Sequence, residues 1–378
     1  MPPETVGSDH RPVARRVLVM RPDNIGDVIL AGPLMRGLRR DQPDRRIGLL
    51  ASPAGAMAAP LLPWLDAVVT ARPVWQDLRG DLALDPEREL AFVERLRAGR
   101  WDAAIIATSF RQTAWPAAYA AYLAGIPVRV GFAPDFGGSL LSHPVDPPEV
   151  SLHQAERNLQ LLEPLGVPIA GDQLEVVVPE DARRAVEARL AAVGVQPGEP
   201  ILVVPGASAP ARRPDPRRLG EAARLIARET GRPVIVTGTP RERALVAACR
   251  AAARGATAAV DLGDDLAVPE FAALVEAAAV VVCANSSALH LADALDRPVV
   301  ATYAGTDLPT HWRARRARAA HLTVSTDCSP CYAITCPLAD SPPCLALEPG
   351  DIADAALALL NGLPHSATRT AVEATWAA

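Results

Sequence analysis

The chain has 378 residues, 49% of them hydrophobic, which suits two domains of about 150 to 200 residues better than one. Its formal net charge is −5, and the 38 basic residues, all arginine because the chain holds no lysine, are scattered, so nucleic acid is not an expected partner. The polar N-terminus lacks a secretory signal and the apolar runs are too short to span a bilayer, so we expect a cytoplasmic protein with at most peripheral contact at the inner face of the membrane.

The first half of the chain alternates apolar runs with segments of helical spacing. The runs are typical of strands buried on both faces of a parallel sheet, and they cover residues 17–20, 46–52, 67–72 and 102–109. Helical spacing falls at 86–98 and 114–124. This βαβ order favours a doubly wound parallel sheet.

A helical segment near residues 179–195 and the Pro/Gly-rich stretch QPGEP separate this half from a second, similar one. Its predicted strands are 201–208, 233–239, 256–263, 278–286 and 297–305. The expected fold class is α/β, with two Rossmann-like doubly wound parallel-sheet domains facing a central cleft. We place these domains at residues 14–180 and 181–362, with flexible tails at 1–13 and 363–378.

The loop RPDNIGD follows the first strand. Gly26 permits a close backbone approach, and Asp27 stands at the start of the next helix, where it is either a plain helix cap or a catalytic base. Pro33 is expected to bend that helix.

Two loops of the second half could hold a nucleotide. In PGASAPARRPDPRRL, small residues precede Arg212 and Arg213 and then a helix, which is either an anion cradle or a proline-stiffened loop with solvated arginines. Glu242, after the next strand, could bond ribose hydroxyls, although an ordinary helix-start glutamate fits equally well.

The segment CANSSALHLADAL follows a strongly apolar strand. Asn285, Ser286 and Ser287 could present donors to an anion, and His290 lies in the first turn of the helix that follows. A histidine alone is more often a capping or packing residue, but within this run it is a candidate site residue.

Together these loops resemble glycosyltransferase family 9, the ADP-heptose:lipopolysaccharide heptosyltransferases, which have a GT-B fold. The segments that carry the resemblance are RPDNIGDVILAGPLMRGLR, VVPGASAPARRPDPRRL, NSSALHLADALDRPVVATYAGTD and CSPCYAITCPLADSPPCL. The resemblance extends over roughly residues 15–360. It implies a cell-envelope enzyme of lipopolysaccharide biosynthesis that uses an ADP-sugar donor and a glycan, glycolipid or small-molecule acceptor, with no cofactor required for catalysis.

The resemblance also implies residue roles. Asp27 would be the general base, preceded by Gly26, and the donor diphosphate would lie near Ser208, Asn285, Ser286, Ser287 and His290. Arg213 would replace a phosphate-binding lysine, Glu242 would meet the ribose, and Leu266 would line the adenine pocket.

Two positions depart from the family pattern: Asp215 replaces a tryptophan, and Ser287-Ala288 replaces Gly-Pro. They leave open a GT-B enzyme with a natural-product acceptor and a non-catalytic sugar-nucleotide binder. A nucleotide-sugar epimerase also stays open, whereas a dehydrogenase is disfavoured because no strand precedes a GxGxxG motif.

Six cysteines include four at spacings of two, four and seven residues, which could hold a structural zinc ion or an Fe–S cluster or stay as thiols: Cys328, Cys331, Cys336 and Cys344. Cys249 and Cys283 fit single buried thiols. In the first half, Trp115, Tyr119 and Tyr122 recur at helical spacing, which is more typical of a core than of a sugar platform.

Overall fold

The computed structural model describes residues 14–77, 80–255, 259, 260, 262, 266–339 and 341–363. The predicted tails therefore lie outside the described residues, apart from residue 363. The chain divides into two compact domains: the first comprises the chain up to Ala59 and Trp64–Asp172, and the second comprises Pro60–Pro63 and the chain from Gln173 onward.

Each domain contains a six-stranded sheet in which all neighbouring strands are parallel. The first sheet has the order β3-β2-β1-β4-β5-β6. Its strands are β1 (Arg16–Arg21), β2 (Arg46–Ala51), β3 (Ala67–Thr70), β4 (Ala103–Ile106), β5 (Val128–Phe132) and β6 (His143–Val145).

The second sheet has the order β12-β11-β10-β7-β8-β9, which is the same winding read from the other edge. Its strands are β7 (Ile201–Val204), β8 (Val234–Val236), β9 (Ala259–Val260), β10 (Val280–Ala284), β11 (Val299–Thr302) and β12 (Ala319–Leu322). Both sheets thus have the doubly wound arrangement that the apolar runs predict, and the fold class is confirmed.

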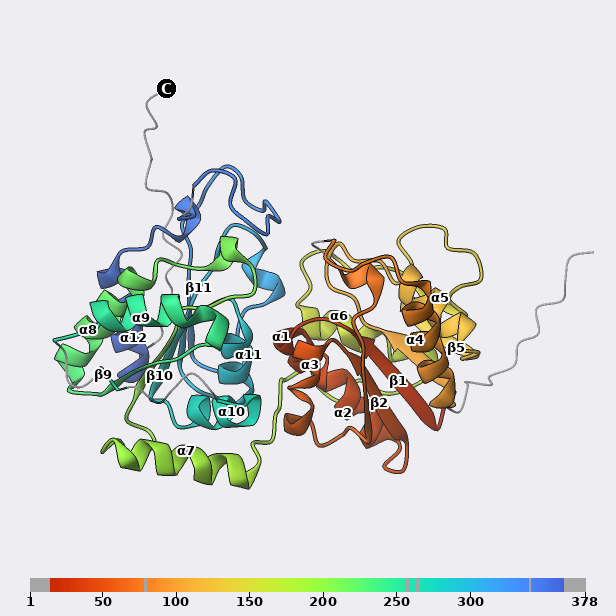
Figure 1. The fold of residues 1–378 in the computed structure, drawn as a ribbon, viewed down its shortest axis with the longest axis horizontal. Coiled ribbons are helices and arrows are strands. Elements are labelled where there is room, and N and C mark those ends of the chain that lie inside the picture. Colours follow the sequence, from red (N-terminus) through yellow and green to blue (C-terminus); the bar gives the residue numbers. More distant parts are fainter. Residues whose placement is uncertain are drawn as a thin grey trace, which may run out of the picture. The chain divides into compact units, whose positions relative to one another are not determined.

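Helices connect most of the successive strands and cover the sheets (Figure 1). In the first domain they are α1 (Ile25–Leu30), α2 (Gly32–Asp41), α3 (Pro53–Ala56), α4 (Pro86–Ala98), α5 (Trp115–Leu123) and α6 (Gln154–Gln160). In the second they are α7 (Glu180–Ala192), α8 (Pro216–Thr230), α9 (Arg243–Ala252), α10 (Val268–Glu276), α11 (Ser287–Ala294) and α12 (Pro349–Leu360).

The cores follow from the apolar strands. In the first domain, Leu18, Met20 and Ile106 pack with Phe92 and Leu96 of α4. In the second, strands β7, β8 and β10 pack against α8, α9 and α12 in one buried cluster. Few aromatic rings are needed to fill these cores, because alanine side chains allow the helices to lie close to the valine-rich sheets.

Pro33 does more than bend the first helix. The helix ends before it, at Leu30, and α2 begins at Gly32 with the proline in its first turn, where no N–H is needed. Within the described part of the chain, no helix is both long and apolar enough to cross a membrane.

Candidate active site

In doubly wound sheets, ligands bind beyond the carboxyl ends of the strands where the winding reverses. This switch point lies between β1 and β4 in the first sheet and between β7 and β10 in the second. The loops that begin there contain residues 22–27 and 107–112 in the first domain. In the second domain they contain residues 205–209 and 285–290.

Asp27 lies at the switch point of the first sheet, in the first turn of α1. Its Oδ2 accepts the Asn24 backbone N–H at 3.2 Å, and its Oδ1 accepts a hydrogen bond from Arg21 Nη2 at 2.9 Å. The carboxylate therefore caps the helix, as one sequence interpretation holds. Its side chain is still 20% exposed, so it can also reach a substrate, and Gly26 is buried beside it.

Arg21 and Asp23 complete this network, and sequence reasoning missed both. Arg21 has no exposed side-chain surface; its Nη1 donates to the Ala107 carbonyl at 3.0 Å and its Nη2 also donates to Ser109 Oγ. Asp23 Oδ2 lies 3.2 Å from Arg21 Nε, and Asp23 Oδ1 accepts from Gln112 Nε2 at 2.8 Å. An arginine ending an otherwise apolar central strand, with aspartates two and six residues later, is the signal that could have found them.

Burial raises the pKa of Asp23, and the neighbouring charge of Asp27 acts in the same direction. The Arg21 guanidinium and the hydrogen bond from Gln112 oppose this shift. The switch point of the first domain thus holds two carboxylates in different surroundings around one buried cation.

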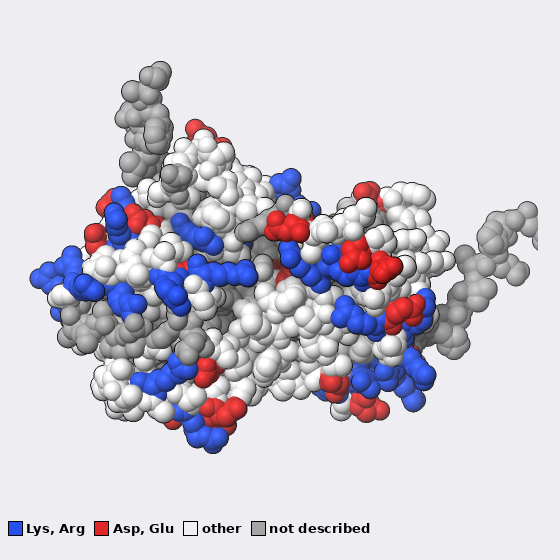
Figure 2. All heavy atoms as spheres, viewed as in Figure 1, with Lys and Arg blue, Asp and Glu red and all other residues white. Residues whose placement is uncertain are grey.

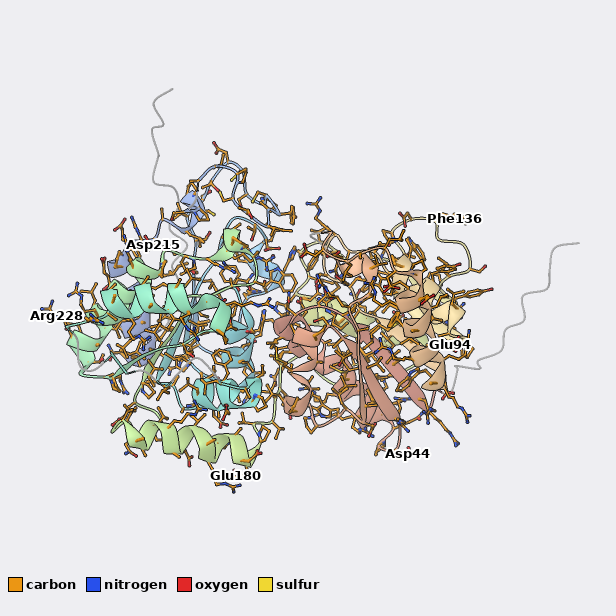
Figure 3. The ribbon with its side chains drawn as sticks, in the orientation of Figure 1. Asp44, Glu94, Phe136, Glu180, Asp215 and Arg228 are labelled. Atoms are coloured by element: carbon orange, nitrogen blue, oxygen red, sulfur yellow. The ribbon has the colours of Figure 1, made fainter. Side chains whose placement is uncertain are left out.

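In the second domain, the loop after β7 contains Ser208, which is exposed, and Arg213, which is partly buried. Arg213 Nε donates to the Ala207 carbonyl at 2.8 Å, which folds the arginine back over its own loop. Asp215, labelled in Figure 3, accepts the Arg217 N–H at 2.8 Å and caps α8. The position where the family pattern has tryptophan is therefore used to start a helix.

Glu242 lies against the same loop. Its Oε2 accepts hydrogen bonds from both the N–H and the hydroxyl of Thr239, each at 2.9 Å, as expected of a helix-start glutamate. Its carboxylate also packs on Gly206, where an added Cβ would lie 2.1 Å from Oε1. Glu242 is thus held beside the loop that contains Ser208. Leu266 is partly exposed and lies ahead of α10.

The loop after β10 leads into α11. Ser286 precedes the helix in an extended conformation, and its Oγ is buried without a hydrogen-bond partner among the described residues. Asn285 is 7% exposed and Ser287 is partly exposed. His290 is 5% exposed, and its ring lies 6.4 Å from that of Trp312. The N–H groups of the first turn of α11 favour an anion at this end of the sheet.

The four clustered cysteines are free thiols in one neighbourhood. Burial raises the pKa of Cys344, and the nearby Cys328, Cys331 and Cys336 add to the shift. Across the described residues, however, no three His, Cys, Asp or Glu side chains are arranged to hold a metal ion. A structural metal here stays a prediction, which elemental analysis of protein purified under reducing conditions tests. Cys249 and Cys283 are fully buried, as predicted.

Comparison with solved structures identifies the architecture. A family 9 glycosyltransferase from Veillonella parvula superposes with a TM-score of 0.73 at 17% identity, covering 92% of this chain and 97% of that one. ADP-heptose LPS heptosyltransferase II of E. coli gives a TM-score of 0.70 at 20% identity, covering 92% and 99%. E. coli heptosyltransferase WaaC with ADP gives 0.60 at 16% identity, covering 81% and 91%. None of the curated protein sequences matches the chain.

Two doubly wound domains and these similarities define a protein of the GT-B fold. The model of glycosyltransferase family 9 (heptosyltransferase) matches residues 89–341, more than half of the chain. The chain therefore belongs to glycosyltransferase family 9.

Proposed function

We propose that this enzyme is an inverting transferase that moves a heptose or related sugar from an ADP-activated donor to a hydroxyl of a glycan or glycolipid, in lipopolysaccharide biosynthesis. The observation that carries the proposal is the partly exposed Asp27 carboxylate at the switch point of the first sheet, in a chain of family 9. Relatives of similar fold include an ADP-heptose transferase and an enzyme solved with ADP.

In the proposed reaction, Asp27 takes the proton of the acceptor hydroxyl. The hydroxyl oxygen then bonds to the anomeric carbon, and the bond from that carbon to the diphosphate of ADP breaks. Inversion requires the base and the leaving group to lie on opposite faces of the sugar. The reaction therefore requires the acceptor end of the first domain and the donor end of the second to meet over one pair of substrates.

The second domain would hold the donor. Hydrogen-bond donors would come from Ser208, Asn285, Ser286, Ser287 and His290, and Arg213 would supply positive charge for the diphosphate. An arginine can do this with a planar pair of N–H groups where lysine would offer a point charge. Glu242 would accept from the ribose, and Leu266 would contact the adenine.

Release of ADP that depends on acceptor, with the anomeric configuration of the product read by NMR, tests the reaction. General base catalysis contributes about 10² to 10⁴-fold, so Asp27→Ala and Asp27→Asn should lower kcat at least a hundredfold while ADP still binds. Asp41→Asn is the matched control. Asp41 is the last residue of α2, away from Asp27 in α1, and its carboxylate pairs with Arg45 at 2.8 Å. Unchanged kcat in both Asp27 variants would remove this residue from the mechanism.

A thermal-shift panel of ADP-, UDP- and GDP-sugars tests the donor, because a ligand that binds only the folded state raises the unfolding temperature. A preference for UDP would reject the ADP assignment. A non-catalytic binder is the second candidate, since Asp215 caps α8 where the family pattern has tryptophan. Such a protein would bind ADP but would release none when acceptors are added, including natural-product acceptors.

A further inference from the structure

Three charges lie at the end of β1: two carboxylates and the buried cation that they share. Arg21 is fully buried, and its guanidinium contacts Asp23 at 3.2 Å and Asp27 at 2.9 Å. A buried arginine needs compensation for the water that it loses, and a single carboxylate would supply it. Here there are two, so the second carboxylate calls for an explanation beyond stability.

The two carboxylates are not equivalent. The Asp27 side chain is 20% exposed and that of Asp23 is 9% exposed. Asp23 is also fixed by Gln112, whose own Oε1 accepts the Ser109 N–H at 2.7 Å. Asp23 is thus held inward by the loop after β4, and Asp27 is the member of the pair that a substrate can reach.

Counting charges shows what Asp23 contributes. An isolated Arg21–Asp27 pair would be neutral, and the guanidinium would hold the negative charge of Asp27 in place, which opposes proton uptake. The Arg21 guanidinium, 3.2 Å from Asp23, opposes the rise that burial causes in the pKa of Asp23, and with Asp23 ionised the three groups carry one net negative charge. They become neutral when Asp27 accepts a proton.

Another positive charge near this network increases the need for the negative charge of Asp23. Arg157 of α6 is 7% exposed, stacks between Phe110 and Phe132 at 5.0 and 4.3 Å, and interacts electrostatically with Arg21. Glu156 of α6 accepts its own helix's His153 N–H at 3.1 Å, and α3 holds no ionisable residue. The positive charge beside the carboxylates therefore exceeds that of Arg21 alone.

We propose that Asp23 is a positioning residue that offsets the charge of Arg21, so that Arg21 orients Asp27 without suppressing its ability to accept the acceptor's proton. This inference rests on the proposed function, in which Asp27 is the base. Arg21 then links β1, α1 and the loop after β4 through its hydrogen bonds, and the carboxylate of Asp23 offsets its positive charge.

Asp23→Asn tests the inference, because its amide oxygen can still accept the hydrogen bond from Gln112 while the negative charge is lost. We expect kcat to fall about tenfold or more and the KM for the donor to stay within about twofold. The acid limb of the kcat/KM profile should move to lower pH by about one unit or more, because an uncompensated cation within hydrogen-bond distance disfavours proton uptake. A merely structural role would lower kcat without moving that limb.

Two further variants keep the test decisive. Asp23→Ser removes the same charge with a smaller side chain and should move the limb in the same direction. Arg21→Gln/Asp23→Asn removes both charges and should return the limb toward that of the parent enzyme. Circular dichroism at each pH establishes that the proteins compared are folded, and Asp41→Asn controls for the loss of one carboxylate.

The same variants distinguish an error in this inference from an error in the proposed function. If Asp27→Asn is inactive but the limb stays in place in folded Asp23→Asn and Asp23→Ser, this inference is wrong and the proposed function stands. If Asp27→Asn is as active as the parent, the proposed function is wrong, and the role of Asp23 is lost with it.

Discussion

Replacing Asp293 should destabilise the second domain strongly. This residue of α11 is 1% exposed, and its Oδ1 accepts three backbone N–H groups, those of Arg315 at 2.9 Å, Arg316 at 2.7 Å and Ala317 at 2.9 Å. Hydrogen bonds to a charged acceptor each contribute about 1.5 to 3 kcal/mol. Since the N–H of the exposed Arg316 can bond to water instead, Asp293→Ala should lower the free energy of unfolding by about 3 kcal/mol.

Urea denaturation followed by far-UV circular dichroism measures this loss, through the change in midpoint at constant slope. Asp293→Asn keeps an oxygen at the same position without the charge, so it should lose only about half as much. Asp296→Asn is the control, because Asp296 is exposed and approaches Arg316 only to 3.9 Å. A loss below about 1 kcal/mol in Asp293→Ala would refute this account of how α11 is attached to the 315–317 loop.

Three further predictions concern the second domain. Gly206→Ala should displace Glu242 and weaken ADP binding about tenfold or more by calorimetry, because the new methyl group would lie 2.1 Å from the carboxylate. Burial lowers the pKa of His321 to about 4, below its ordinary 6.5, so unfolding should become easier as the pH falls from about 6.5 toward 4, and His321→Gln should flatten that dependence in urea titrations. Burial raises the pKa of Cys249 to about 12 and that of Cys283 further still, so both thiols should resist a disulfide reagent at pH 8 that labels Cys328.

Each of these has its own contrary result. Gly350→Ala is the glycine control, since no atom lies within 4 Å of its added Cβ, and equal ADP affinity in both variants would contradict the role of Gly206. A His321→Gln protein with the pH dependence of the parent would point to another titrating group. Rapid labelling of all six thiols in folded protein would show that the two buried cysteines are accessible.

The sequence predicted the central strands well because they are continuous apolar runs, and β1, β4, β7 and β10 have this form. It did not predict β5, β6 or β12, which lie toward one edge of each sheet. Arg129 interrupts β5, and its guanidinium donates to the carbonyls of Ile126 and Leu140, a tertiary arrangement that a local pattern cannot show. Pro144 similarly hides the short β6.

The candidate site likewise contains residues that the sequence indicates and residues that it does not. Asp27 and the Asn285–Ser287 turn could be found from the sequence because they stand where a strand passes into a helix. Arg21 was missed: an arginine at the end of an apolar strand, followed by two aspartates, indicates that an ion-pair network could form, but it does not show that the guanidinium turns inward to meet Asp27 and Ser109. The contact with Ser109 depends on β1 and β4 being neighbours, which only the strand order establishes.

Charged side chains are scattered over the visible faces of both domains among larger uncharged areas, and on the first domain arginines lie next to acidic residues (Figure 2). Beneath that surface, every strand of one sheet comes from residues 16–145 and every strand of the other from residues 201–322. Among the strands that the structure describes, neither sheet contains one from the other half of the chain. Mutations that remodel the end of one sheet consequently leave the strand pairing of the other intact. Under the proposed function, selection could therefore alter the choice of sugar nucleotide and the choice of acceptor hydroxyl by separate routes.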